Sequence, residues 1–560
     1  MVGVSGVGKV NEAADPESTN KGNTFQSMKR ITTTGLIVIS AIFMVLFDNL
    51  AFFRDVVEVY PVSLSNIGFL TSLVVVLTGV IALLLVLVSL KYTIKPVFIL
   101  TLFISSIASY FMNNYNVIID HTMIQNIFST NVKEAIDLFS FKLVLYVLFL
   151  GFLPALWIYW VEMKYGTVKA EFISHLKLVA IILAVIFFSV LIFSKFYASF
   201  LREHQTLRYR TNPTYSLYSM GEYLNNKFKD RHIELKHIGE DAKIKVTDTD
   251  RELIIVVIGE AARRDRFSLN GYPRETNPLL KKEDVISLRN VQSCGTTTSV
   301  SVPCMFSIYS RGSYSEKKGK STENLLDVLS HTNRVDILWR DNNSDSKDVA
   351  LRVQYEDYKN PDKNPICDEE CRDEGMLEGL QDYIDSRTRG DILIVLHQMG
   401  NHGPAYYKRY PKSFEKFKPT CQTNELNKCT NDEISNAYDN AILYTDYFLY
   451  KVIKLLKQND GRFETAMIYM SDHGQSLGEK GVYLHGLPYF IAPDTQKNIA
   501  TIFWLGDSFK AQQKLLKNKI NTEYTHENFF HTVLGLLEVN TSLYDKKKDI
   551  IYSNELDIKP

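Results

Sequence analysis

Carboxylates and imidazoles follow several short apolar runs in the C-terminal half of the chain. Glu260 follows IIVVIG, Asp472 and His473 follow AMIYMS, and His397 and His402 come just after ILIVL. These side chains supply the oxygen and nitrogen ligands that zinc accepts. Each alone has an ordinary explanation, such as a helix cap or a turn. Their shared position at the ends of apolar runs predicts a zinc site.

A metal-activated nucleophile is predicted in a segment rich in hydroxyl groups. Residues 293–307 read SCGTTTSVSVPCMFS, with a cysteine near each end. A divalent cation lowers the pKa of a coordinated hydroxyl and makes it a better attacking group. A Ser/Thr-rich turn that caps a helix has a similar composition. Composition therefore leaves four candidate nucleophiles: Thr296, Thr297, Thr298 and Ser299.

The apolar runs predict strands of a mainly parallel sheet. They are short and β-branched, and longer polar segments with helical spacing separate them. Continuous apolar runs suit strands that are buried on both faces of an α/β sheet, whose sites lie past the carboxyl ends of the strands. The predicted strands are Leu253–Ile258, Val335–Trp339, Ile392–Leu396, Ala466–Met470 and Ile499–Leu505.

The N-terminal part predicts a five-helix transmembrane domain. Its apolar stretches are about 16 to 25 residues long, near the length that crosses a bilayer. A polar leader precedes them, so a cleavable signal peptide is not expected. The leader's GVSGVGKV resembles a phosphate-binding loop but has no preceding strand and no Ser or Thr after its lysine. The stretches are Ile31–Phe53, Ile67–Leu90, Val97–Met112, Phe141–Trp160 and Leu178–Phe200.

Lysines set the predicted orientation. They gather in the leader and in the second and fourth loops, which are therefore expected to be cytoplasmic. Five crossings place everything after residue 201 outside. The predicted parts are a leader (1–30), a transmembrane domain (31–200), an interfacial or solvated connector (201–244) and an outer domain (245–560). Lys plus Arg and Asp plus Glu are both 63 among 560 residues, which argues against a nucleic-acid partner.

Six cysteines lie in the outer domain as three pairs of near neighbours. In an oxidising compartment this pattern predicts three local disulfides. A cysteine metal site is the alternative, but only one pair has metal-like spacing. The pairs are Cys294 with Cys304, Cys367 with Cys371, and Cys421 with Cys429.

Several long segments resemble the phosphoethanolamine transferases that modify lipid A, a family that includes the mobile colistin-resistance enzymes. They read VIGEAARRDRFSLNGYPRETNP, SCGTTTSVSVPCMFS, LWRDNNSDSK, HQMGNHGPAYYKRYP and SDHGQSLGEKGVYLHGLPY. The resemblance covers nearly the whole chain after the leader. It implies a five-helix transmembrane domain and an alkaline-phosphatase/sulfatase-like domain with a mainly parallel central sheet.

The resemblance also implies roles for individual residues. Thr298 is the implied nucleophile, and it ligates one catalytic zinc with Glu260, Asp472 and His473. The other roles that the resemblance implies concern the substrate. His402 and His485 are implied to face it or a second zinc, and contacts are implied for Asn343, Lys347, Asn126 and Glu134. Gln475 departs from the glutamate expected in relatives, which puts a charged substrate contact there in doubt.

The implied reaction is a double displacement. Thr298 takes phosphoethanolamine from phosphatidylethanolamine, and lipid A then takes it from the threonine, with a histidine such as His402 or His485 handling a proton. The amine that is added to lipid A is cationic, so the modified lipid A is expected to attract polycationic polymyxins less strongly. The implied protein is a monomer of the bacterial inner membrane, with its catalytic domain in the periplasm.

Other classes fit less well. A sulfatase needs Cys or Ser followed by x-Pro-x-Arg, but Met305 stands where the arginine is required. Transfer of phosphoglycerol, or transfer to another envelope acceptor, remains an alternative. So does a non-catalytic, membrane-tethered binding protein, although the apparent site is intact. A transporter is poorly supported, because the apolar stretches hold few charges, chiefly Asp48, Lys142 and Lys195.

Overall fold

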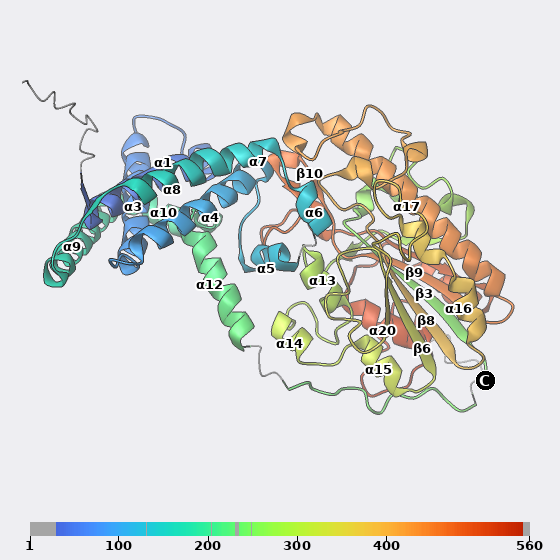
Figure 1. The fold of residues 1–560 in the computed structure, drawn as a ribbon. Helices are drawn as coiled ribbons and strands as arrows, with labels where there is room; N and C mark the ends of the chain where they lie inside the picture. Colours follow the sequence, from blue (N-terminus) through green and yellow to red (C-terminus); the bar gives the residue numbers. More distant parts are fainter. Residues whose placement is uncertain (1–29, 130–131, 203, 230–233, 248, 553–560) are drawn as a thin grey trace, which may run out of the picture.

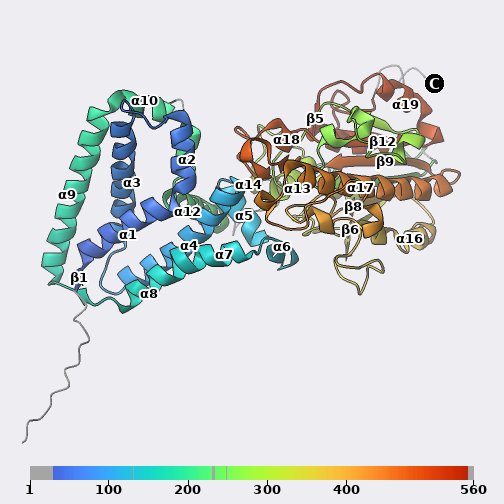
Figure 2. The same ribbon diagram turned by 90° about the horizontal axis from the view of Figure 1, so that it is seen from above.

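The chain folds into a helical part and an α/β part, which lie at opposite ends of the molecule in two perpendicular views (Figures 1 and 2). The computed structural model describes residues 30–552, apart from 130–131, 203, 230–233 and 248. The leader, with its GVSGVGKV segment, therefore lies outside the described residues. Short helices between the two parts, among them α5 (His121–Ser129), connect them in both views.

The helical part contains spans that are long and apolar enough to cross a bilayer. Within the described residues there are four such helices, and a fifth span results if the bent pair α1 (Thr33–Asp48) and α2 (Leu50–Val59) counts as one. The four are α3 (Ile67–Leu87), α4 (Ile94–Tyr115), the segment Phe141–Trp160 that contains α7 and α8, and α9 (Val168–Ile192).

The first predicted span is broken, because a polar residue interrupts it. The axes of α1 and α2 meet at 62° around Asn49. The buried Asn49 side chain donates to the carbonyl oxygens of Met44 (2.9 Å) and Asn212 (2.6 Å), and its own oxygen accepts from the Asn212 backbone N–H at 2.8 Å. These bonds satisfy the buried amide. They also tie the connector to the break.

The last predicted span is shifted toward the N-terminus. Its helix α9 begins at Val168, ten residues before the apolar stretch, and ends at Ile192. A second helix, α10 (Ser194–Arg202), follows at once. Thr167 explains the early start, because its side chain accepts a hydrogen bond from the Ala170 N–H and caps the helix.

All five predicted strands are present in one seven-stranded sheet. Its order is β4-β12-β9-β3-β8-β6-β7, and the five strands from β9 to β7 are mutually parallel. Strand β12 runs antiparallel to β9 and β4, so the sheet is mainly, not wholly, parallel. The strands are β3 (Glu252–Gly259), β4 (Ile286–Leu288), β6 (Val335–Asp341), β7 (Gln354–Asp357), β8 (Asp391–His397), β9 (Glu464–Ser471) and β12 (Thr501–Leu505).

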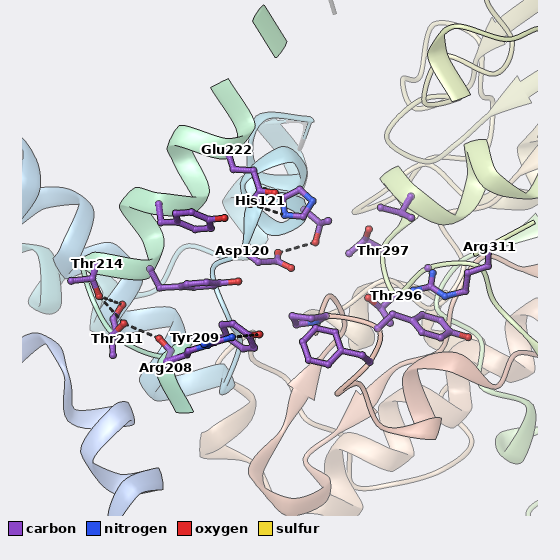
Figure 3. Close-up of a pocket in the computed structure, with 18 residues that line it drawn as sticks. Asp120, His121, Arg208, Tyr209, Thr211, Thr214, Glu222, Thr296, Thr297 and Arg311 are labelled. Atoms are coloured by element: carbon purple, nitrogen blue, oxygen red, sulfur yellow. Dashed lines mark hydrogen bonds and ion pairs between the residues drawn. The ribbon is translucent and has the colours of Figure 1, made fainter. Parts of the chain in front are cut away.

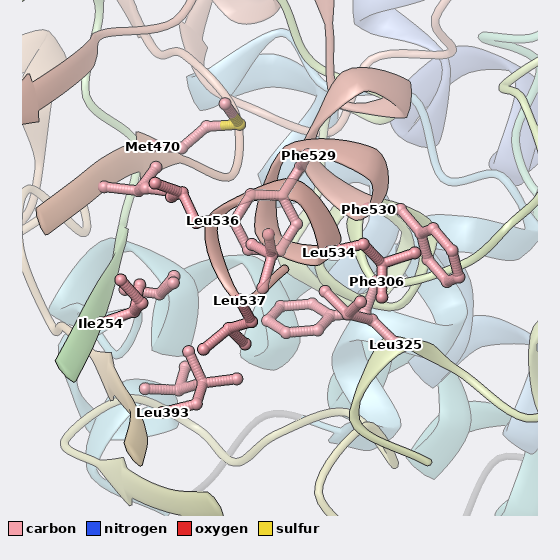
Figure 4. Packing of buried hydrophobic residues seen from close by; sticks show 14 of the residues in the cluster. Ile254, Phe306, Leu325, Leu393, Met470, Phe529, Phe530, Leu534, Leu536 and Leu537 are labelled. Carbon is pink, nitrogen blue, oxygen red and sulfur yellow. The ribbon is translucent and has the colours of Figure 1, made fainter. Parts of the chain in front are cut away.

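Helices cover both faces of this sheet. Ile254 of β3 belongs to the cluster that contains Phe529 and Leu534 of α20 (Glu527–Leu536), which Figure 4 shows. The next residue, Ile255, points to the other face, where α17 (Asn431–Asn459) packs. Burial on both faces explains why the strands read as continuous apolar runs.

The six cysteines form the three predicted disulfides. They join Cys294 to Cys304, Cys367 to Cys371 and Cys421 to Cys429. All six thiols are used, so the alternative of a cysteine metal site is excluded. The first disulfide ties the hydroxyl-rich loop to helix α13 (Thr298–Met305).

Candidate active site

The predicted zinc ligands meet at the carboxyl ends of two neighbouring strands. Glu260 follows β3, and Asp472 and His473 follow β9. The two strands are parallel and in register up to the pair Gly259 and Ser471, so the residues that follow them lie side by side. Thr298, at the start of α13, completes the group.

The four side chains are buried and within contact distance. The Thr298 hydroxyl donates to Glu260 Oε2 at 3.0 Å and lies 3.4 Å from His473 Nε2. That nitrogen lies 3.4 Å from Glu260 Oε1 and 3.3 Å from Asp472 Oδ2. Thr298 is 8% exposed and the other three are fully buried. The geometry favours Thr298 over its neighbouring hydroxyls as the nucleophile.

This group fits a divalent cation. His473 Nδ1 lies 2.7 Å from the Gly474 carbonyl oxygen and donates to it, so Nε2 turns a lone pair toward two carboxylates. Two buried carboxylates beside a lone pair repel one another unless a cation lies between them. The facing ligand atoms of Glu260, His473 and His485 lie within 4.8 Å of one another. Carboxylate and imidazole groups in this arrangement suit zinc.

A histidine that the sequence did not single out fixes the nucleophile's loop to the sheet. His526 is fully buried. Its Nδ1 accepts from the Cys294 backbone N–H at 3.1 Å, and its Nε2 donates to the Ser471 carbonyl oxygen at 2.9 Å. It therefore links the loop before Thr298 to the strand before Asp472. Only the fold brings these segments together, so no sequence motif marked it.

The two predicted phosphoethanolamine contacts have different surroundings. The buried Asn343 amide donates to Glu260 Oε2 at 2.9 Å and to the Gln398 carbonyl oxygen at 2.7 Å. Its donors are therefore directed at a zinc-ligand candidate. Lys347 and the next residue after Asn343, Ser344, line a cavity of about 130 Å³ that also contains Thr298. Ser344 is not marked by any motif in the sequence.

His402 and His485 line the same cavity. Burial, followed by the nearby Arg409, lowers the pKa of His402 to about 3. Burial also holds the pKa of His485 well below its ordinary value. Both rings are therefore neutral at physiological pH. Gln475 accepts from His485 Nδ1 at 2.9 Å, so the Nε2 lone pair of His485 is free to face the cavity.

The helical part supplies one wall of this cavity. Met123, Asn126 and Ile127 line it from α5. Asn126 Oδ1 accepts a hydrogen bond from Ser299 at 2.6 Å, next to the nucleophile. Asn126 therefore lies at the cavity beside Thr298, and its contact with substrate stays a prediction. The side chain of Glu134 lies outside the described residues.

His397 does not join the site. Its Nδ1 pairs with Asp341 at 2.9 Å, and both side chains are fully buried in the sheet. The strand end points this imidazole into the core, whereas the loop that follows carries His402 to the cavity.

A larger cavity of about 710 Å³ lies beside the loop that leads to Thr298 (Figure 3). Thr296 and Thr297 line it together with two arginines. The Arg311 guanidinium lies 3.3 Å from the ring centroid of Tyr489, and that of Arg208 lies 5.3 Å from the ring of Tyr209. The cavity therefore combines cationic and aromatic surfaces beside the loop that leads to Thr298.

Comparison with known families identifies the class of each part. The sulfatase family model matches residues 252–539, which contain the sheet and the site. The model of phosphoethanolamine transferase EptA/EptB matches residues 77–228 of the helical part and connector.

Individual relatives extend the match over nearly the whole chain. Phosphatidylethanolamine transferase Mcr-1 of Escherichia coli is 41% identical over 528 residues, covering 92% of this chain and 96% of its own. Phosphoethanolamine transferase EptA of Escherichia coli K12 is 37% identical over 527 residues, with the same coverage. The solved EptA of Neisseria meningitidis superposes with a TM-score of 0.89 at 33% identity, over 93% of this chain and 98% of that one. The chain belongs to the phosphoethanolamine transferase family.

Proposed function

We propose that this protein transfers phosphoethanolamine from phosphatidylethanolamine to lipid A through a covalent phosphoethanolamine-threonine at Thr298. The observation that carries the proposal is the Thr298 hydroxyl, which donates to Glu260 within a buried group of candidate zinc ligands. The named activities of Mcr-1 and EptA support the transferred group and the donor.

The chain's own groups account for the first displacement. The Thr298 oxygen attacks phosphorus, and the ester bond to diacylglycerol breaks. The hydroxyl proton already points at Glu260 Oε2. Glu260, Asp472 and His473 would hold a zinc ion, which when bound would lower the pKa of the Thr298 hydroxyl and offset charge on the phosphoryl oxygens. Lys347 lines the cavity and adds a positive charge near those oxygens.

The second displacement regenerates Thr298. An acceptor oxygen attacks the phosphorus, and the bond to the threonine oxygen breaks. His402 and His485 line the cavity, and each neutral ring carries a lone pair. One of these lone pairs would take the proton of the attacking acceptor oxygen, or would hold a second zinc ion. The cavity with Arg208 and Arg311 suits a sugar phosphate acceptor, because arginine pairs with phosphate oxygens and the tyrosines offer flat surfaces for sugar rings.

The architecture fits lipid substrates on both sides of the reaction. Phe111, Ile127 and Leu138 give the small cavity an apolar wall next to the helical part. We place the protein in the bacterial inner membrane with five spans, the bent α1–α2 pair counted as one, and the catalytic domain (245–560) in the periplasm. We assign it as a monomer without a nucleic-acid partner. Its product, the modified lipid A, attracts polymyxins less strongly.

Mass spectrometry of lipid A tests this assignment. A polymyxin-sensitive bacterium would express either the wild type or Thr298→Ala, with membrane levels matched by immunoblot. The expected result is a phosphoethanolamine increment on lipid A from the wild type alone. An increment from both proteins would remove Thr298 from the mechanism. No increment from either would exclude lipid A and redirect the search to other envelope acceptors.

A further inference from the structure

The described residues between α4 and α7, 116–129 and 132–140, are bonded to the α/β part at several places. One is the hydrogen bond between Asn126 and Ser299 beside Thr298. Another is the Gln125 amide, which donates to Glu316 at 3.0 Å. A third lies at Asp137, the last residue of the short helix α6 (Val132–Asp137). Because Met123, Asn126, Ile127 and Leu138 line the small cavity, these residues form part of its wall.

Asp137 makes a buried ion pair with the α/β part. Its side chain is 7% exposed. Oδ1 accepts from Lys408 Nζ at 2.6 Å, and Oδ2 accepts from Arg409 Nη2 at 2.7 Å. Asn424 donates to the carbonyl oxygens of Asp137 and Phe139, both at 2.7 Å. Burial alone would raise the pKa of Asp137, but Arg409 and Lys408 hold it below its ordinary value, so the carboxylate is charged.

Arg409 connects this ion pair to a residue of the active site. Its guanidinium is 1% exposed and serves acceptors on three segments. Nε donates to the His402 carbonyl oxygen at 2.6 Å, Nη2 to Asp137 at 2.7 Å, and Nη1 to Glu370. The planar fork of an arginine can hold three such partners at fixed angles, whereas a lysine cannot.

We propose that Asp137 is a positioning residue for phosphoethanolamine transfer: through Arg409 it holds the described residues 116–129 and 132–140 against the catalytic domain and fixes the loop of His402. The inference rests on the proposed function and deepens it. When the pair is formed, a single guanidinium is bonded both to Asp137, beside the cavity-lining Leu138, and to the loop of His402, which lines the same small cavity. Glu370 remains as a partner of Arg409 when Asp137 is neutralised, so the domain itself keeps its ion pair.

Steady-state kinetics of the full-length protein in detergent micelles, with phosphatidylethanolamine as varied donor, test the proposal. Asp137→Asn keeps the size of the side chain and removes its charge. We expect the donor KM to rise about tenfold, the loss typical of one charge-assisted hydrogen bond, with kcat within about twofold. Asp137→Glu should restore most of the affinity.

The matched control is Asp439→Asn. Asp439 is also buried and pairs with an arginine, Arg274, at 2.9 Å, but both belong to the α/β part. It should leave the donor KM unchanged. Amide hydrogen exchange supplies a second readout: Asp137→Asn should speed exchange in 121–129 and in 399–405 together, whereas Asp439→Asn should not. If Asp137→Asn fails to fold, Arg409→Lys, which keeps the charge but loses the fork, should show the same KM and exchange changes.

An unchanged donor KM in Asp137→Asn, or equal effects of Asp137→Asn and Asp439→Asn, would overturn the positioning role. Absence of turnover in the wild type would instead contradict the proposed function. The two failures are therefore distinguishable in one set of assays.

Discussion

Replacing Asn343 by alanine separates two roles that this residue could play. The resemblance implies that Asn343 holds phosphoethanolamine, but its amide donates to Glu260 Oε2 at 2.9 Å. Asn343→Ala removes a hydrogen bond to a buried, charged group. Such bonds contribute about 1.5 to 3 kcal/mol. At about 1.4 kcal/mol per factor of ten, the expected loss of zinc affinity is about 10- to 100-fold. This agrees with the usual effect of residues that orient metal ligands.

Zinc affinity and donor kinetics distinguish the roles. If Asn343 acts by orienting Glu260, the variant should bind zinc about 10- to 100-fold more weakly. At saturating zinc its donor KM should then be unchanged. Asn342→Ala is the matched control, because Asn342 is equally buried but donates to Asp373 and the Cys371 carbonyl oxygen rather than to a candidate zinc ligand. A raised donor KM with normal zinc affinity in Asn343→Ala would refute the reasoning and restore the substrate-binding role.

Four further predictions follow from the site. Lys347→Ala should lower kcat/KM about 10- to 100-fold and Lys347→Arg less, measured with the lipid donor; equal losses would argue against a charge effect. Removing zinc with a chelator should abolish transfer and zinc should restore it, whereas full activity in the metal-free protein would exclude a metal role. Cys294→Ser should lower folded yield, since closing so short a loop contributes about 2 to 3 kcal/mol; normal yield and activity would show that the disulfide is dispensable. Burial lowers the pKa of His526 from 6.5 to about 4. The folded state therefore resists protonation of this ring. The free energy of unfolding should fall by about 2 kcal/mol as pH drops from 8 to 5, which would be measured as a lower Tm. His526→Asn should flatten this pH dependence, and an equally steep dependence in that variant would assign it to other groups.

The strands and the zinc-ligand candidates were predictable because they depend on local pattern. Each strand is buried on both faces, so its apolar run is continuous, and the chemistry follows directly after it. Glu260 and Asp472 meet because β3 and β9 are parallel neighbours, and the α/β rule anticipates that placement without giving the strand order. His397 shows the limit: it follows the same rule but turns into the core.

Features that depend on contacts between distant segments were not predictable. His526 forms hydrogen bonds with the backbone of Cys294 and Ser471, which are far from it in sequence. Asp137 meets Arg409 only when the helical and α/β parts pack together. The break at Asn49 was hidden in a hydropathy average, because a single buried amide, satisfied by Asn212, interrupts the helix there.

The proposed covalent phosphoethanolamine-threonine at Thr298 gives the most direct test of the proposed mechanism. Purified protein would be incubated with phosphatidylethanolamine without acceptor, quenched in acid, digested and mapped by mass spectrometry. The account predicts a phosphoethanolamine increment on the peptide that contains Thr298, and loss of that increment when lipid A is added before the quench. An increment on another residue, or transfer to lipid A with no modified peptide at any time, would contradict it.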